Sequence, residues 1–265
     1  MSGRKLQIRD LSGRKRKVEV LFEDEHLIVL NKPAPLLTIP DHWDPGRPNL
    51  LTFLQRKLAP ERPFVVHRLD AGTSGVIVFA KTPEAHRALC AQFDRQKVER
   101  TYEAIVAGEV ERDQGVVSRK IAPNPRVPGH VIVSSRGKDA VTEYRVLERF
   151  VGFTRVLLRP KTGRPHQLRV HMQALGHPVA TDPDYGGRAA LYLSEFKPTF
   201  SLAEGEVERP FIARPSLHAL SLAFTHPVSG ERLEVTAEFP KDYRTFLRIL
   251  REYRQVARFL ESETM

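Results

Sequence analysis

Short apolar runs rich in β-branched residues alternate with polar turns along the whole chain. Such runs predict strands, and we expect them at 18–24, 27–33, 64–66, 76–80, 100–107, 131–133, 141–147, 153–158 and 233–237. Apolar residues at helical spacing predict helices at 50–58, 82–93 and 165–175 and after residue 240. No regular β-α-β alternation is present, so we predict an α+β fold with a mixed, largely antiparallel sheet and flanking helices.

The most informative stretch is 63–81, PFVVHRLDAGTSGVIVFAK, in which two predicted strands flank a polar loop. Gly72 and Gly75 allow positive φ, so the loop can lie close beneath a ligand while both strands hold Asp70. Arg68 is two residues away, and a neighbouring cation favours the charged carboxylate. Asp70 is therefore a candidate nucleophile or base. The alternative is an ordinary turn aspartate, which caps backbone amides in many loops.

Length and composition narrow the class of protein. The 265 residues suffice for a sizeable core, and no apolar run approaches the roughly 18 residues that span a bilayer. Cys90 is the single cysteine, so it forms no internal disulfide and no cysteine metal site. No signal pattern opens the chain. We expect a soluble, cytoplasmic, monomeric protein.

The charge predicts a polyanionic partner. The net charge is +10, from 42 Lys and Arg against 32 Asp and Glu. Residues 1–17 hold seven basic residues and one acid, and we expect a flexible basic tail there, followed by one domain over 18–265. Acid-free basic stretches at 115–138 and 155–169 predict a phosphate-binding face; an ordinary solvated surface is the alternative.

Two further segments carry candidate chemistry. Tyr102 lies on the strand predicted at 100–107, where it is either a packed core aromatic or a site residue. In GRPHQLRVH at 163–171, Arg164 falls at a strand-to-helix junction, where it could pair with Asp70 or bind a phosphate. His166 and His171 are five apart and lack an adjacent glutamate, so we predict no metal site.

These segments together resemble a known family. His67-Arg68-Leu69-Asp70 with Thr73-Ser74-Gly75 is similar to the catalytic signature of the RluA family of pseudouridine synthases. Four more ordered motifs match: Asn-Lys-Pro at 31–33, Arg-x-Tyr at 100–102, the 163–171 segment, and the group formed by 181–186, 217–219 and 224–227. The departures are Pro35 for the usual glycine, Arg100 for lysine and Thr181 for glycine. The matches span roughly residues 18 to 240.

The resemblance implies a pseudouridine synthase fold and the conversion of a uridine in structured ribosomal or transfer RNA to pseudouridine, without a cofactor. It implies that the reaction depends on Asp70, by attack on C1′ or by a glycal route, and that Tyr102 faces the target base and is a candidate for proton transfer at carbon 5. We expect Arg68 and Arg164 to support the site. The RNA-binding candidates are Arg100, Lys161 and Arg169.

Three expectations stay open on the sequence alone. Many members carry a small RNA-binding domain before the catalytic one; seventeen residues leave no room for it, and the basic tail could replace it. A non-catalytic RNA-binding or ribosome-associated protein on the same scaffold is the main alternative function. A hydrolase that uses Asp70 is a third reading, but no Gly-x-Ser-x-Gly motif supports it.

Overall fold

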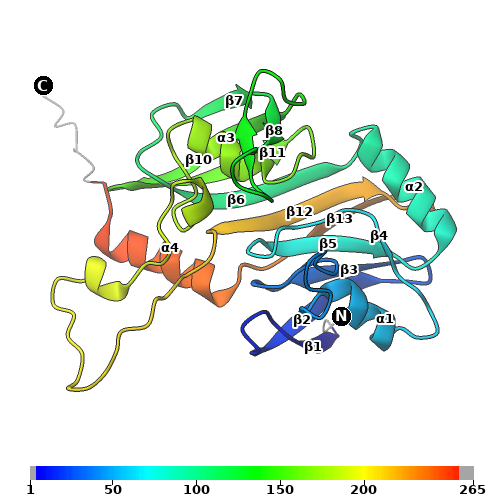
Figure 1. Ribbon diagram of the computed structural model, residues 1–265, viewed down its shortest axis with the longest axis horizontal. Helices are drawn as coiled ribbons and strands as arrows, with labels where there is room; N and C mark the ends of the chain where they lie inside the picture. Colours follow the sequence, from blue (N-terminus) through cyan, green and yellow to red (C-terminus); the bar gives the residue numbers. More distant parts are fainter. Residues whose placement is uncertain (1–3, 257–265) are drawn as a thin grey trace, which may run out of the picture.

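The computed structural model describes residues 4–256, and one long sheet runs through them (Figure 1). The sheet order is β1-β2-β3-β5-β12-β6-β11-β10-β7, with β13 paired to β12 and β4 to β5. The strands are β1 Lys5–Arg9, β2 Lys15–Glu23, β3 Leu27–Lys32, β4 Phe64–Val65, β5 Ser74–Ala80, β6 Glu99–Ala107, β7 Gln114–Ser118, β8 Ile121–Pro123, β9 Val131–Val133, β10 Val141–Phe150, β11 Phe153–Pro160, β12 Leu217–Thr225 and β13 Arg232–Thr236. All pairs are antiparallel except β5 with β12, so the predicted fold class is confirmed.

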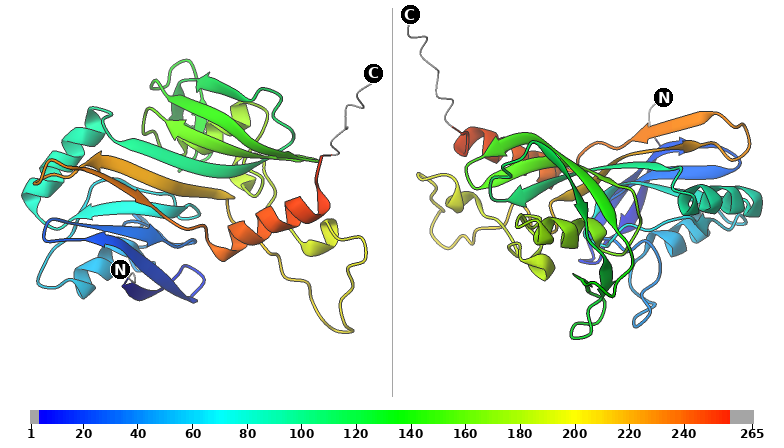
Figure 2. Two further views of the ribbon diagram at one scale, coloured as in Figure 1. Left: turned by 180° about the vertical axis from the view of Figure 1, so that it is seen from behind. Right: turned by 90° about the horizontal axis from the view of Figure 1, so that it is seen from above.

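Within the described residues, four α-helices and two short 3-10 helices accompany the sheet. They are α1 Leu50–Lys57, α2 Pro83–Asp94, α3 Gln167–Ala174, α4 Lys241–Tyr253, η1 Pro183–Tyr185 and η2 Leu193–Glu195. Helices α1 and α3 lie on the face shown in Figure 1, and α4 lies on the opposite face (Figure 2). No helix within residues 4–256 is long and apolar enough to cross a membrane.

The capping signals place α2 as expected. Thr82 is the N-cap, and its side chain accepts a hydrogen bond from Ala85 N at 3.2 Å, while Pro83 occupies the first turn. Helix α3 begins at Gln167 instead of Pro165, because His166 at its N-cap adopts a left-handed backbone with φ 48°. Gly176 follows the helix with φ 90°, the predicted C′ position.

Alternation within β3 and β5 builds two cores on opposite faces of the sheet. Ile28 and Leu30 pack towards α1, whereas Leu27 and Val29 pack towards α2. Gly75 shows how tightly β12 approaches β5: it has φ 116°, and a Cβ there would lie 2.1 Å from the carbonyl oxygen of Ala219. Only glycine fits this crossing, which joins the two halves of the sheet.

The basic N-terminal segment differs from the predicted flexible tail. Residues 5–9 and 15–23 pair as a hairpin at the edge of the sheet, with Leu6 and Ile8 buried. Asp10 is fully buried in the turn and accepts a hydrogen bond from Arg16 Nε at 2.6 Å. The alternation of Lys5 to Arg9 explains the difference, since every second residue faces the core. The boundary predicted at residue 18 falls inside β2.

Candidate active site

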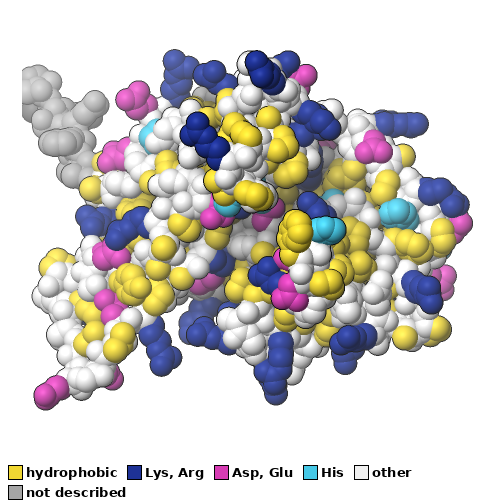
Figure 3. Space-filling model, viewed as in Figure 1, with side chains coloured by type: hydrophobic (Ala, Val, Ile, Leu, Met, Phe, Trp, Pro, Cys, Tyr) yellow, Lys and Arg dark blue, Asp and Glu magenta, His cyan; other side chains and the backbone are white. Residues whose placement is uncertain are grey.

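A cavity of about 460 Å³ opens between the two halves of the sheet (Figure 3). One wall is the loop between β4 and β5, which carries Asp70. The other wall is formed by β6 and by the 160–169 segment that joins β11 to α3. Leu217 of β12 contributes from the middle of the sheet. Segments far apart in the sequence therefore meet at one site.

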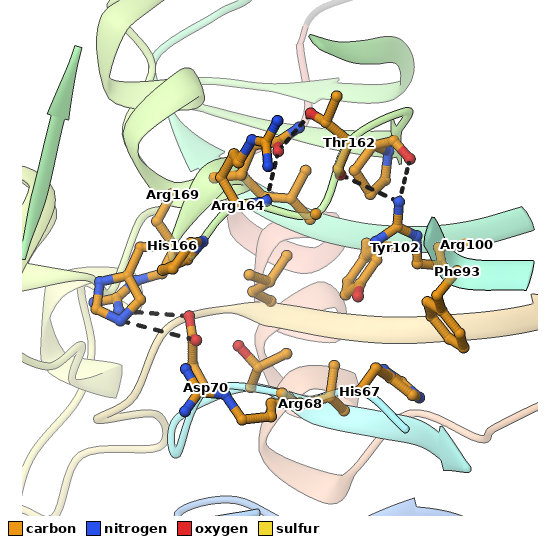
Figure 4. Close-up of a pocket in the computed structure, with 18 of the residues that line it drawn as sticks. His67, Arg68, Asp70, Phe93, Arg100, Tyr102, Thr162, Arg164, His166 and Arg169 are labelled. Atoms are coloured by element: carbon orange, nitrogen blue, oxygen red, sulfur yellow. Dashed lines mark hydrogen bonds and ion pairs between the residues drawn. The ribbon is translucent and has the colours of Figure 1, made fainter. Parts of the chain in front are cut away.

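Six of the seven predicted site residues line this cavity; the six are Arg68, Asp70, Arg100, Tyr102, Arg164 and Arg169. The seventh, Lys161, is exposed and forms an ion pair with Glu143 at 2.8 Å. Figure 4 shows the Asp70 carboxylate facing His166 and Arg169 across the cavity. The site residues thus come from both walls of the cavity.

The cation beside Asp70 is Arg169, not Arg68 or Arg164. Arg169 Nη1 lies 3.7 Å from Asp70 Oδ2. Arg164 points away from Asp70 and donates from Nε to the carbonyl oxygen of Asp139 at 3.0 Å (Figure 4). Arg68 is exposed and forms no ion pair among the described residues. Of the two roles left open for Arg164, pairing with Asp70 is not observed: the side chain lies before α3 and bonds to Asp139, whereas Arg169 on α3 faces Asp70.

Arg169, which the sequence suggested as an RNA-binding residue, is held by two carboxylates, the buried Asp182 and the exposed Asp184. Its Nε and Nη2 donate to the two oxygens of Asp182, each at 2.6 Å, and Nη2 also donates to Asp184 at 2.8 Å. Burial lowers the pKa of Arg169, but these bonds and the charge of Asp182 outweigh it and raise that pKa overall. The guanidinium stays charged and fixed, with Nη1 left to face Asp70.

His166 is the second group at Asp70. Its Nε2 lies 3.8 Å from Asp70 Oδ1, and its Nδ1 lies 2.8 Å from the hydroxyl of Tyr185. That hydroxyl already accepts a hydrogen bond from Val131 N at 3.1 Å. Burial lowers the pKa of His166, opposed by the charge of Asp70, which favours a neutral ring near pH 7. If Tyr185 donates to Nδ1, the ring proton sits on Nε2 and points at Asp70.

The backbone around Asp70 is anchored on both sides. Thr38 Oγ1 donates to the carbonyl oxygen of Leu69 at 2.8 Å and accepts from Leu69 N at 3.2 Å. Lys32 Nζ donates to the carbonyl oxygens of Leu36 at 2.7 Å and Ala71 at 3.4 Å. These bonds fix the backbone on both sides of Asp70, so the loop holds its side chain at the cavity.

The ion pair between Arg214 and Asp242 also supports the Asp70 loop. Arg214 Nη1 donates to the carbonyl oxygen of Gly72 at 3.1 Å, and Asp242 at the start of α4 holds Arg214 through two bonds of 2.7 and 2.8 Å. A Cβ on Gly72 would lie 2.7 Å from Pro215 Cδ, so glycine is required there for close approach. Gly72 does not adopt the positive φ that glycine allows; Gly75 does.

Tyr102 and Arg100 have different surroundings on β6. Figure 4 shows the Tyr102 side chain directed into the cavity, and its hydroxyl forms no hydrogen bond with the described residues. Burial raises the pKa of Tyr102; Arg100 opposes the rise and Asp70 adds to it. Arg100 donates to the carbonyl oxygens of Pro160 at 3.3 Å and Thr162 at 3.2 Å. Arg100 therefore holds the start of the 160–167 turn in place.

Two residues that the sequence did not single out shape the remaining walls. His67 stacks on Phe93 at 4.8 Å and accepts a hydrogen bond from Val78 N at Nε2, and burial lowers its pKa to about 3. The buried side chain of Gln167 bonds to Arg164 N and Val141 O, closing the 160–167 turn. Both lie inside recognised motifs, but their roles depend on contacts across the fold.

Comparison with known proteins identifies the family to which the chain belongs. Residues 26–174 match the family described as RNA pseudouridylate synthase. The chain belongs to this family and is an isomerase that acts on RNA, as the sequence motifs predicted. Relatives named "Ribosomal large subunit pseudouridine synthase D" are 38% identical in Pseudomonas aeruginosa, over 90% of this chain and 73% of that one, and 42% identical in Xanthomonas campestris pv. campestris, over 89% and 70%.

Solved structures agree with this assignment. Human RNA Pseudouridylate Synthase Domain Containing 4 superposes with a TM-score of 0.66 and 27% identity, covering 88% of this chain and 92% of that one. Human RNA Pseudouridylate Synthase Domain Containing 1 gives 0.62 and 26%, with coverage of 91% and 97%. The fold of the family therefore accounts for nearly the whole described chain.

Proposed function

We propose that this enzyme converts a uridine of large-subunit ribosomal RNA to pseudouridine, with Asp70 as the catalytic carboxylate. The observation that carries the proposal is the position of Asp70, which faces the Arg169 guanidinium at 3.7 Å inside the cavity. The choice of RNA rests on the relatives named for the large ribosomal subunit. A cavity of about 460 Å³ lies within the usual range for small-molecule sites, so one flipped-out nucleotide fits it by size.

The reaction breaks the bond between N1 of uracil and C1′ of the sugar, rotates the base and joins C5 to C1′. The proton on C5 leaves and N1 ends protonated, so the change is an isomerisation that balances without another reactant. Asp70 acts at the sugar, either by attack on C1′ or by removal of a sugar proton. Arg169 holds the carboxylate in place through Nη1 while Asp182 fixes the rest of its guanidinium.

Tyr102 is the proposed group at carbon 5. Its raised pKa keeps the phenol protonated in the free enzyme, so it takes the C5 proton as its own hydroxyl proton passes to the uracil, whose N1 ends protonated. The hydroxyl faces the cavity with no hydrogen-bond partner among the described residues, which leaves it available to substrate. The ring also limits the space in which the detached uracil can move.

The remaining predicted residues divide between RNA contact and support. Arg68 and Lys161 are exposed cations near the cavity, and we propose that they contact RNA phosphates. Arg164 is half-buried at the cavity wall and is proposed to contact the flanking backbone. Such contacts would offset the few kcal/mol needed to flip the target base. We propose that the enzyme acts as a cytoplasmic monomer.

The test is pseudouridine mapping of total RNA from cells with and without the protein. We expect one or a few large-subunit positions to lose pseudouridine, and the wild-type chain but not Asp70→Asn to restore them. A site lost from transfer RNA alone would overturn the choice of substrate. An unchanged map together with RNA binding would support the alternative of a non-catalytic RNA-binding protein.

A further inference from the structure

Trp43 is the most exposed large apolar side chain in the described part of the protein. It lies in the loop between β3 and α1 and is 89% exposed, while most other large apolar side chains are buried. It is also the only tryptophan in the sequence. Tryptophan is normally largely buried, because its ring removes a large apolar area from water. An exposed indole on an ordered loop therefore indicates a contact surface.

The loop around Trp43 is stiffened by its own hydrogen bonds. Asp41 Oδ1 accepts from Trp43 N at 2.9 Å, and Asp41 Oδ2 accepts from Arg47 Nη1 at 2.7 Å. The ring of His42 meets that of Trp43 edge to face, with centroids 4.9 Å apart. These bonds order the backbone that carries the indole, and among the described residues the ring is in aromatic contact only with His42. A ring presented in this way loses little conformational entropy on binding.

The loop is tied directly to the Asp70 loop. Thr38, at its start, makes two hydrogen bonds to the backbone of Leu69, the residue before Asp70. Trp43 is five residues further on, so its backbone lies at most about 17 Å from that of Thr38. In the right-hand view of Figure 2 this loop and the β8–β9 hairpin project from the same face of the sheet. Trp43 is thus displayed on the active-site face.

The loop around Trp43 carries little positive charge, so it suits stacking on a base better than binding of phosphates. Arg47 is the only Lys or Arg at 38–49, and it is already paired with Asp41. A cluster of exposed cations lies on the β8–β9 hairpin and its flanks; its members are Arg119, Lys120, Arg126, Arg136 and Lys138. The hairpin suits the phosphate backbone, whereas the loop offers an aromatic face with no free cation. That combination is typical of a protein that stacks an unpaired base while cations follow the backbone.

We propose that Trp43 is a stacking platform for an unpaired base of the RNA substrate, outside the cavity that takes the target nucleotide. This inference rests on the proposed function, because it takes structured RNA as the substrate. It adds a specific contact to the general attraction of the basic surface. Stacking accepts every base, so Trp43 contributes affinity and the register of the strand more than base identity.

The single tryptophan allows a direct measurement. Indole emission of the full chain is recorded while unmodified large-subunit ribosomal RNA transcript is added, and binding is followed separately through the anisotropy of a dye-labelled fragment of it. We expect emission to fall in step with binding, and acrylamide to quench the bound protein less than the free one. Binding with unchanged emission and unchanged acrylamide quenching would overturn the proposal. Absence of binding would instead contradict the proposed function.

Substitutions separate stacking from simple apolar contact. Trp43→Ala and Trp43→Leu are expected to raise Kd for the RNA about 5- to 100-fold, while Trp43→Phe stays within about threefold of the wild type. The matched control is Val207→Ala, since Val207 is 86% exposed on the segment between η2 and β12 and should not alter Kd. Equal affinities for all four variants and wild type would overturn the proposal. An emission change with intact ribosomal subunits but not with free RNA would assign Trp43 to a protein contact instead.

Discussion

The Nη1 atom of Arg169 lies 3.7 Å from Oδ2 of Asp70, and the rest of the same guanidinium is locked to Asp182. Asp182 is fully buried and Arg169 is nearly so. The charge that faces the proposed catalytic carboxylate is therefore fixed by the core of the protein and does not depend on RNA. In this respect the preorganised Arg169 differs from the exposed cations around the cavity.

Arg169→Lys is expected to impair the enzyme far more than Arg164→Lys. Lysine keeps the charge but cannot bridge Asp70 and Asp182 with a planar fork. We expect kcat to fall about 100-fold or more and the free energy of unfolding to fall by about 3 kcal/mol, because a buried carboxylate loses its partners. Arg164 donates to a single carbonyl, so its change should stay below about tenfold. Steady-state kinetics measures kcat and urea unfolding measures stability for both variants. Equal losses of kcat in the two variants would contradict this ranking.

Tyr185→Phe tests whether His166 positions Asp70. The substitution removes the hydroxyl that lies 2.8 Å from His166 Nδ1, so the ring loses its orienting partner. We expect kcat to fall about 3- to 10-fold and stability to fall by about 1–2 kcal/mol, since Val131 N also loses its acceptor. In a His166→Ala background the same change should leave kcat nearly unaffected. Additive effects on kcat in this double-mutant cycle would show that the two residues act independently.

Tyr102→Phe separates chemistry from packing at carbon 5. Phenylalanine keeps the ring but removes a hydroxyl that has no hydrogen-bond partner in the described structure. We therefore expect stability within about 0.5 kcal/mol of the wild type and a loss of at least about 100-fold in kcat. Single-turnover rates at saturating RNA are the measurement, with thermal unfolding as the control. A near-normal rate would make Tyr102 a wall of the cavity only.

Lys32→Met should change how stability depends on pH. Burial lowers the pKa of Lys32 to about 7, partly offset by the charge of Asp70, from 10.5 for a free lysine. Between about pH 7 and 10.5 the unfolded chain therefore binds more protons at this group, and its contribution makes the native state more stable as pH rises. The variant lacks the amine, so this rise should be missing from its own pH curve and should appear in the wild-type-minus-variant difference. Urea unfolding at pH 6.5, 8 and 9.5 measures it, and a constant difference would contradict the assignment.

The sequence predicted the family and the fold class because these depend on local spacing and motifs, and Asp70, its candidate catalytic residue, lies in the cavity. It missed β12 as a strand, although Leu217–Thr225 lies between the two halves of the sheet, since its polar residues His218 and Ser221 interrupt the apolar pattern. It offered Arg164 as a possible partner of Asp70 and did not consider Arg169 for that place, because both occur in one motif and the start of α3 at Gln167 is needed to tell which one lies beside Asp70. The ion pair between Arg214 and Asp242 could not be predicted, because no motif in the sequence links the two residues.

The N-terminal segment shows the same limit. Its basic residues suggested a free tail, yet Leu6, Ile8 and Val18 pack into the core beside α1. The pairing of β1 with β2, across a turn that buries Asp10, cannot be predicted without knowing which strand is the partner. Deleting residues 2–17 would therefore remove part of the sheet, and its effect on RNA binding would not report on charge alone.

The most direct test of the central claim is the activity of purified Asp70→Asn on unmodified large-subunit ribosomal RNA. Asparagine keeps the size of the side chain but removes its charge. We predict that pseudouridine formation falls at least about 10³-fold while Kd for the RNA stays within about threefold and the unfolding curve is unchanged. Turnover of Asp70→Asn near the wild-type rate, measured against a preparation from cells with an empty vector, would contradict the account.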